Sequence, residues 1–270
     1  MGSHEKISLN GEITTWQEAA LNPSSLLGRN WVYTTINTYR YRPLALDEKL
    51  AYASASCKKL FDLKPEVTPH KLASEIHDLL YFGLYPESGN TLNIYFIPSS
   101  SGTIDRLIIH EATTPYEGYA LLSIRPTTTI ANYELPFEAH HTNVSMTSAR
   151  FADNYASSRG YTTALRANRA GTLLSSGDNP LFAVRGQELV TTPISAGARR
   201  SVEREQMMRV ANAAGVMVVE EPLQVEDLEQ YEELMVFTPV GIQSISSVGE
   251  IKLVNIYAKL LSSHLGILDK

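Results

Sequence analysis

The order of strand-like and helix-like segments is the feature of this sequence that most restricts its fold. Residues 31–41 are dense in β-branched and aromatic side chains, which is typical of a strand. From Leu46 the apolar residues recur every three or four positions, which predicts a helix. Further β-type runs then follow without regular helices between them. Because strict βαβ alternation is missing, we expect an α+β protein rather than a doubly wound sheet.

The first half of the chain predicts short strands around two helices. Asn10-Gly11 suits a turn after the first strand, and a loop rich in Asn, Pro and Ser precedes residue 31. One helix follows from Leu46 to Leu60, and a second begins at Thr68-Pro69, a capping residue followed by Pro at the first helical position. Strands are then predicted at 92–97, 107–110, 119–125 and 128–134.

The second half predicts a second set of strands and helices. Strands are expected near 173 and at 181–184, 188–192, 216–219, 234–238 and 242–246. A helix carrying Val202 to Ala214 should end at Gly215, a short helix should begin at Glu226, and a last helix should run from about 251 to 265. We expect an N-terminal domain of 1–136, a linker of 137–142 and a C-terminal domain of 143–270.

Composition excludes several classes of function. The net charge is −6 and no basic run is present, so nucleic-acid binding is not expected. No apolar run approaches the roughly 18 residues of a membrane span, and the N-terminus lacks a signal-peptide pattern. Cys57 is the single cysteine and lies on an apolar helical stripe, so we expect a buried, inert thiol. These features lead us to expect a cytoplasmic protein.

Five passages, spread over residues 8–250, resemble the fold-type-IV pyridoxal-phosphate enzymes. These are branched-chain and D-amino-acid aminotransferases and aminodeoxychorismate lyase. The helix from Leu46 is similar to the family pattern HLxRLxxSAxxL. The other passages are Leu9-Asn10-Gly11-Glu12, Phe182-Ala183-Val184 with Thr192-Pro193, Gly197-Ala198-Arg199-Arg200, and the run from Glu220 to Ile242. The resemblance implies a two-domain fold of the D-amino-acid aminotransferase type and a homodimer with a cleft between domains.

The resemblance also places the ancestral cofactor site. Asn154 and Tyr155 match an Asn-Tyr pair that follows the Schiff-base lysine, and the lysine's own position holds Arg150. The phosphate-binding arginine is aligned with Tyr52, and the glutamate that keeps the pyridine nitrogen protonated with Ser175. Further ligand-binding positions are Arg199 and Arg200 at a helix start, and Thr238 in a second phosphate-binding turn.

The missing lysine argues against the family reaction. A guanidinium cannot form the imine that this chemistry needs, and it stays protonated near neutrality. No lysine occurs between Lys71 and Lys252, so a shift of the alignment by a few residues changes nothing. The passage between Asn154 and Asn179, which in relatives supplies a helix and a strand beside the cofactor, is about ten residues short by this alignment. We therefore expect no pyridoxal phosphate and no catalytic residue of the family kind.

Several residues keep two interpretations. Arg150 is either an anchor for an anion or an arginine paired with an acid such as Asp153. Arg199 and Arg200 are either anion ligands or solvated, and Arg204 is expected to be solvated beside acidic neighbours. His140-His141 does not predict a metal site, because adjacent residues on a strand face opposite ways.

Two functions follow from these observations. The first is a protein that kept the fold, lost the reaction and binds a small anionic ligand or a partner in the old cleft. The second is an aminotransferase or lyase that acts on amino acids or chorismate-derived substrates by a modified mechanism.

Overall fold

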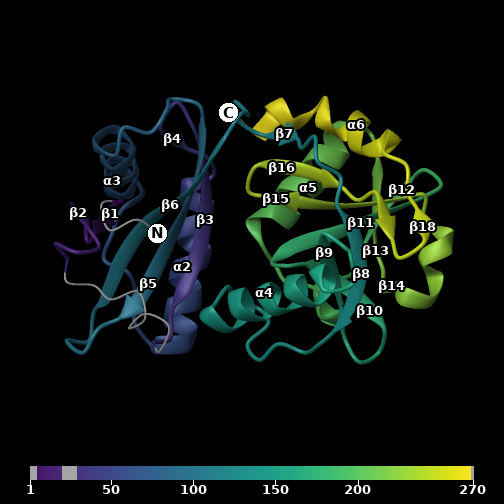
Figure 1. The fold of residues 1–270 in the computed structure, drawn as a ribbon, viewed down its shortest axis with the longest axis horizontal. Helices are drawn as coiled ribbons and strands as arrows, with labels where there is room; N and C mark the ends of the chain where they lie inside the picture. The colour runs from purple at the N-terminus through teal and green to yellow at the C-terminus, as the bar shows by residue number, and fades with distance from the viewer. Residues whose placement is uncertain (1–4, 20–28, 269–270) are drawn as a thin grey trace. The chain divides into compact units, whose positions relative to one another are not determined.

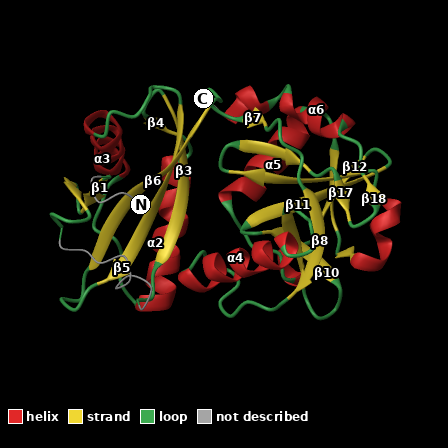
Figure 2. Cartoon of the chain, in the orientation of Figure 1, coloured by secondary structure: helices red, strands yellow, loops and turns green. Residues whose placement is uncertain are grey.

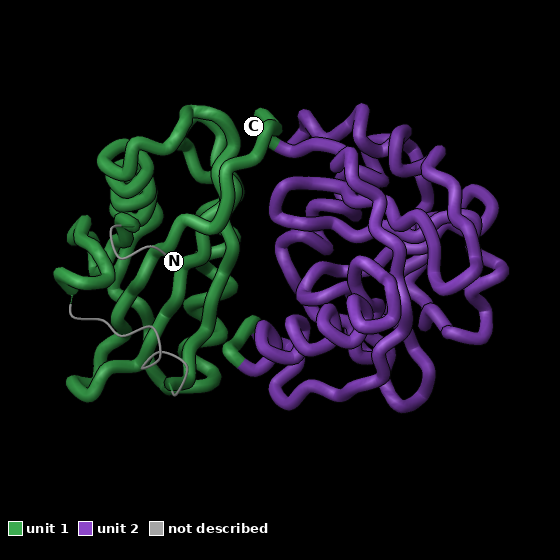
Figure 3. The backbone as a smooth tube through the Cα atoms, in the orientation of Figure 1, with its two compact units in different colours: residues 1–118, 141–143 green, residues 119–140, 144–270 purple. Residues whose placement is uncertain are grey.

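The computed structural model describes residues 5–19 and 29–268, and contacts divide it into two compact units (Figure 3). Unit 1 comprises residues 1–118 and 141–143, and unit 2 comprises 119–140 and 144–270. This division lies upstream of the predicted boundary at 136. The reason is that β8 (Thr127–Asn132) pairs in parallel with β9 (Thr163–Ala167), so it belongs to unit 2.

Unit 1 is built on an antiparallel sheet with the strand order β2-β1-β6-β5-β3-β4 (Figure 1). Asn10 and Gly11, both at positive φ, form the predicted turn between its first two strands. The predicted Asn-, Pro- and Ser-rich loop falls largely on 20–28, outside the described residues. The strands are β1 (Lys6–Leu9), β2 (Glu12–Thr15), β3 (Val32–Tyr39), β4 (Arg42–Pro43), β5 (Gly89–Pro98) and β6 (Ile104–Thr114).

Two predicted helices of unit 1, α2 (Leu46–Phe61) and α3 (Pro69–Phe82), are confirmed. Thr68 caps α3 by accepting a hydrogen bond from the Lys71 N–H at 3.2 Å. The apolar stripes of both helices pack with β3 and β5 into one core. Cys57 lies in that core and is fully buried, and burial raises the pKa of its thiol to about 12. The expectation of an inert thiol is therefore confirmed.

Unit 2 is built on a mixed sheet whose main path is β18-β17-β8-β9-β10-β11-β15-β16-β7. Fully buried apolar side chains of β9, β10, β11 and β15 fill one core. The remaining strands are β7 (Ala120–Leu121), β10 (Thr172–Ser176), β11 (Asn179–Arg185), β12 (Glu188–Thr191), β13 (Met217–Glu220), β14 (Leu223–Gln224), β15 (Glu233–Thr238), β16 (Gly241–Ser244), β17 (Ser247–Val248) and β18 (Ile251–Lys252).

The helices of unit 2 differ in part from the prediction (Figure 2). α5 (Val202–Ala213) ends before Gly215 as predicted, and η2 (Val225–Gln230) is a 3₁₀ helix near the predicted short helix. The last helix, α6 (Ile256–Ser262), begins later than predicted, because residues 251–252 form β18; the 3₁₀ helix η3 (Leu265–Leu268) follows α6. None of the described helices is long and apolar enough to span a bilayer.

One further prediction about unit 2 is corrected. The predicted strand 119–125 is reduced to β7, because Arg125 turns its guanidinium to the carbonyl oxygens of Ile245, Leu253 and Val254. The passage between Asn154 and Asn179, aligned as about ten residues short, contains the end of α4 (Asn143–Ser157) and the strands β9 and β10. α4 connects the parallel strands β8 and β9, and this crossover frames the site described next.

Candidate functional site

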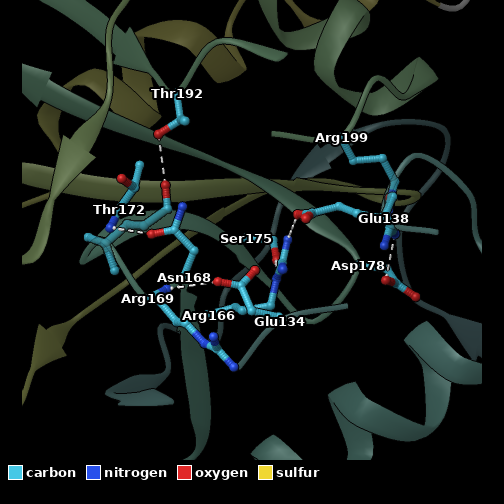
Figure 4. Close-up of polar contacts among 11 residues, drawn as sticks. Glu134, Glu138, Arg166, Asn168, Arg169, Thr172, Ser175, Asp178, Thr192 and Arg199 are labelled. Carbon is cyan, nitrogen blue, oxygen red and sulfur yellow. Dashed lines mark hydrogen bonds and ion pairs between the residues drawn. The ribbon is translucent and has the colours of Figure 1, made fainter. Parts of the chain in front are cut away.

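A buried arginine on β9 is the centre of a polar cluster in unit 2 (Figure 4). Arg166 lies opposite Ser175 of β10 in the strand register, and its side chain is 2% exposed. Its Nε donates to Ser175 Oγ at 3.4 Å, and its Nη2 donates to the carboxylate of Glu138. The guanidinium carbon also lies 5.6 Å from the centre of the Tyr133 ring. Sheet pairing thus fixes the arginine, and three different side chains surround it.

A second arginine joins the same cluster from the segment before α5. The 3₁₀ helix η1 (Ile194–Ala196) ends at Gly197, whose φ of +103° is a conformation that glycine adopts readily. Arg199 follows, with a 9% exposed side chain. Its Nη1 donates to Asp178 Oδ1 and its Nε to the backbone oxygen of Glu138, both at 2.6 Å. Glu138 is therefore held by Arg166 through its carboxylate and by Arg199 through its backbone.

A third buried arginine, Arg204, lies in the first turn of α5. Ser201 caps the helix by accepting from the Arg204 N–H at 3.1 Å. The Arg204 side chain is 5% exposed and donates through Nη2 to Glu220 at 2.7 Å and to the Thr192 carbonyl oxygen at 3.3 Å. The prediction of a solvated Arg204 is therefore wrong. Its environment is set by β13, which brings Glu220 beside the helix start.

The three arginines surround a cavity too small for an organic ligand. It measures about 10 Å³, room for roughly one water molecule, and it is lined by Arg166, Ser175, Arg199 and Arg204 among others. Each arginine has its own carboxylate partner, respectively Glu138, Asp178 and Glu220. The buried positive charge is thus matched by an equal number of acids. Such matching offsets the cost of desolvating these ions.

A larger pocket of about 470 Å³ lies beside the cluster, between β8 and α4. Its wall includes the aromatic residues Tyr133, Phe151 and Tyr155, and Asn132 and Ser148 contribute polar side chains to it. Tyr133 belongs to both places, since it lines this pocket and its ring lies near Arg166. Burial raises the pKa of Tyr133 and the positive charge of Arg166 opposes that shift, so the phenol stays protonated near neutrality. The aromatic pocket and the arginine cluster are therefore adjacent.

The structure separates the predicted site residues of α4 from the cluster. Arg150 and Asn154 are exposed, and Tyr155 is 41% exposed with the Arg159 guanidinium 3.6 Å above its ring. Asp153, the acid proposed as partner of Arg150, accepts a hydrogen bond from Thr163 instead. Of these residues, Tyr155 lines the pocket of about 470 Å³, and none lines the cavity between the arginines.

Two of the other predicted residues belong to the cluster. Ser175 and Arg199 lie in the cluster. Arg200 is exposed and paired with Glu205 at 3.1 Å. Thr238 closes the β15–β16 turn by donating to the Gly241 carbonyl oxygen at 3.0 Å, and Tyr52 is half-buried on α2 of unit 1. The structure therefore brings two of the predicted residues together.

Lys49 on α2 is a buried cation that the sequence analysis did not single out. Lys49 is 3% exposed, and its ammonium donates to the Thr35 carbonyl oxygen at 2.6 Å. No sequence signal pointed to Arg166, Glu138 and Asp178, because only the tertiary structure brings them together.

Comparison with known proteins identifies the family. The family model for class IV aminotransferases matches residues 31–248. This chain belongs to the class IV aminotransferase family. The fold is also similar to the branched-chain aminotransferase of Thermoproteus uzoniensis crystallised with norvaline, with a TM-score of 0.81 and 19% identity over 99% of this chain and 95% of that one. A search of curated proteins returned no match.

Two further solved structures agree on the fold. The branched-chain aminotransferase of Escherichia coli has a TM-score of 0.81 and 17% identity over 98% of this chain and 95% of that one. A hypothetical aminotransferase of Mycobacterium tuberculosis in its pyridoxal-phosphate-bound form has a TM-score of 0.81 and 13% identity over 97% of this chain and 98% of that one. Pyridoxal phosphate is the cofactor of the family, and identities this low support the fold alone.

The residues of the cluster do not fit that cofactor. Its ring nitrogen needs a carboxylate to stay protonated, but the family alignment puts Ser175 at that position, and Ser175 contacts the Arg166 guanidinium. A positive charge there disfavours a protonated ring nitrogen. The lysine is missing throughout 72–251, and the cavity of about 10 Å³ is far below the roughly 300 Å³ of a small ligand pocket. The charge and the missing nucleophile disagree with the cofactor, and the cavity between the arginines is too small to hold it.

Proposed function

We propose that this protein keeps the class IV aminotransferase fold, does not carry out pyridoxal-phosphate chemistry, and binds a small anionic ligand in unit 2. The observation that carries the proposal is the absence of lysine from residues 72–251. Without an amine at the site, neither the imine nor the later proton transfer has a protein group to perform it. The exposed guanidinium of Arg150 cannot replace that amine.

The position of buried arginines supports an anion rather than a cation as the ligand. Arg166, Arg199 and Arg204 supply donors that stay protonated at any physiological pH. Arg204 lies in the first turn of α5 and Arg199 just before that helix, where the helix dipole adds positive potential. The adjacent pocket of about 470 Å³ offers room that the cluster itself lacks. The favoured arrangement is an anionic group directed at the arginines and a ligand body in this pocket.

A cofactor titration tests the loss of the family reaction. Purified protein mixed with pyridoxal phosphate is expected to develop no imine absorbance band at the short-wavelength end of the visible spectrum. Arg150→Lys is the matched control: its new amine is exposed on α4 and apart from the cluster, so this variant is expected to develop no imine band either. A band in the unchanged protein, together with amino-group transfer between an amino acid and a 2-oxo acid, would favour an active enzyme and overturn the proposal.

We also propose a cytoplasmic homodimer, as the resemblance to the family implies. Sedimentation equilibrium of the full chain should give twice the mass of 29.9 kDa. A monomer at all concentrations would contradict the dimer without affecting the proposal about chemistry.

A further inference from the structure

We propose that Arg166 is a binding residue for the carboxylate of an aromatic acid, and that Glu138 occupies this position when no ligand is bound. The inference rests on the proposed function, because it specifies the anion and its contacts. It adds a residue that the family resemblance did not point to, and it assigns the ligand class.

The first support is a buried donor without a partner. Arg166 is 2% exposed, and its Nη1 has no hydrogen-bond partner among residues 5–19 and 29–268. Its other two nitrogens contact Ser175 and a single oxygen of Glu138. A guanidinium presents a planar fork that suits both oxygens of one carboxylate. Glu138 uses only part of that fork, so a ligand carboxylate can make one more hydrogen bond than Glu138 does.

The second support is that Arg166 is held more firmly by the fold than Glu138 is. Arg166 lies within β9, which pairs with β8 on one side and β10 on the other. Glu138 lies in a turn between β8 and α4, beside Phe137, which is 66% exposed and has a φ of +57°. The Glu138 side chain itself is 23% exposed. The Glu138 carboxylate can therefore move to water without breaking strand pairing. The backbone of Arg166, in contrast, is held by strands on both sides.

The third support is the aromatic pocket next to the arginine. Tyr133 lines the pocket of about 470 Å³ and its ring lies 5.6 Å from the Arg166 guanidinium. Phe151 and Tyr155 face the same pocket. Aromatic side chains favour a planar, apolar ligand body by offset or edge-on packing. An acid head at Arg166 and a ring beside Tyr133 together define an arylcarboxylate.

Binding of benzoate, measured by titration calorimetry on the full chain, tests this assignment. Glu138→Gln keeps the size of the side chain but removes its charge, so it should compete less for Arg166. We expect benzoate to bind this variant at least about tenfold more tightly than the unchanged protein, which corresponds to one charge-assisted hydrogen bond. Arg166→Lys in the Glu138→Gln background should remove the gain, because an ammonium lacks the fork.

Glu134→Gln is the matched control. Glu134 belongs to the same connection and is exposed, but it accepts from the Arg169 N–H at 2.9 Å and does not contact Arg166. We expect its benzoate affinity to equal that of the unchanged protein. Equal affinities for Glu138→Gln and Glu134→Gln would overturn the proposal and leave the Arg166–Glu138 pair with a structural role only.

A second variant covers the case in which Glu138→Gln fails to fold. Glu138→Asp keeps the charge and shortens the reach, so it should fold and bind benzoate with an intermediate affinity. If its affinity and its thermal shift with benzoate do not exceed those of the unchanged protein, the proposal is wrong. A pyridoxal-phosphate imine in the unchanged protein would instead contradict the proposed function, so the two failures are distinguishable.

Discussion

At the scale of single residues, buried arginine–carboxylate pairs recur in both units. In unit 1 the Nε and Nη2 of Arg106 on β6 donate to both carboxylate oxygens of Glu75 on α3, at 2.7 and 2.6 Å. Both side chains are 6% exposed. Gly11 lies against this pair, since a Cβ there would come within 2.8 Å of Glu75 Oε1 and its φ is +94°. The pair therefore fixes α3 against the sheet and requires glycine in the first turn.

Loss of one partner of this pair should be costly. We expect Glu75→Ala to lower the free energy of unfolding by about 3–5 kcal/mol, because it leaves Arg106 buried and unpaired. The matched control is Glu205→Ala, which removes the exposed partner of Arg200 and should cost less than about 1 kcal/mol. Urea unfolding of both variants measures the difference. Similar losses in the two variants would show that the buried pair is not what stabilises unit 1.

At the scale of elements, α4 carries the largest difference between prediction and structure. Sequence patterns were sufficient for α2, α3 and α5, because each has a regular apolar stripe. In α3 and α5 the capping side chain also accepts a hydrogen bond from a backbone N–H of the first turn. α4 has small buried residues instead, Ser145, Ala152 and Ala156, which leave a weak stripe. The site was predictable where it follows the family pattern, at Ser175 and Arg199. Arg166 and Glu138 were not, because they meet only through the β8–α4–β9 crossover.

The orientation of α4 predicts unequal effects of substitution on the free energy of unfolding at two positions. Arg150 is exposed, so Arg150→Ala should change the free energy of unfolding by less than about 0.5 kcal/mol. Ala156 is fully buried against β9, so Ala156→Leu should cost roughly 1–3 kcal/mol by overpacking. Urea unfolding distinguishes them. A large loss for Arg150→Ala with none for Ala156→Leu would mean that the helix faces the other way.

At the scale of the whole molecule, the class IV fold is retained across nearly the full chain, while we propose that the family cofactor is not used. The family model covers residues 31–248, and similar solved structures match almost end to end. Within that fold, Ser175, which the family alignment puts at the ring-nitrogen position, lies beside Arg166, and the second half lacks lysine up to Lys252. A fold can persist without its reaction, because packing and site chemistry rest on different residues.

Borohydride reduction after incubation with pyridoxal phosphate tests the central claim most directly. Mass spectrometry of the intact chain and of its peptides should then show no stoichiometric phosphopyridoxyl group, and only scattered, substoichiometric labels on exposed lysines such as Lys58. A single stoichiometric adduct on one lysine, whether the buried Lys49 or any other, would contradict the claim that this protein does not use the family cofactor.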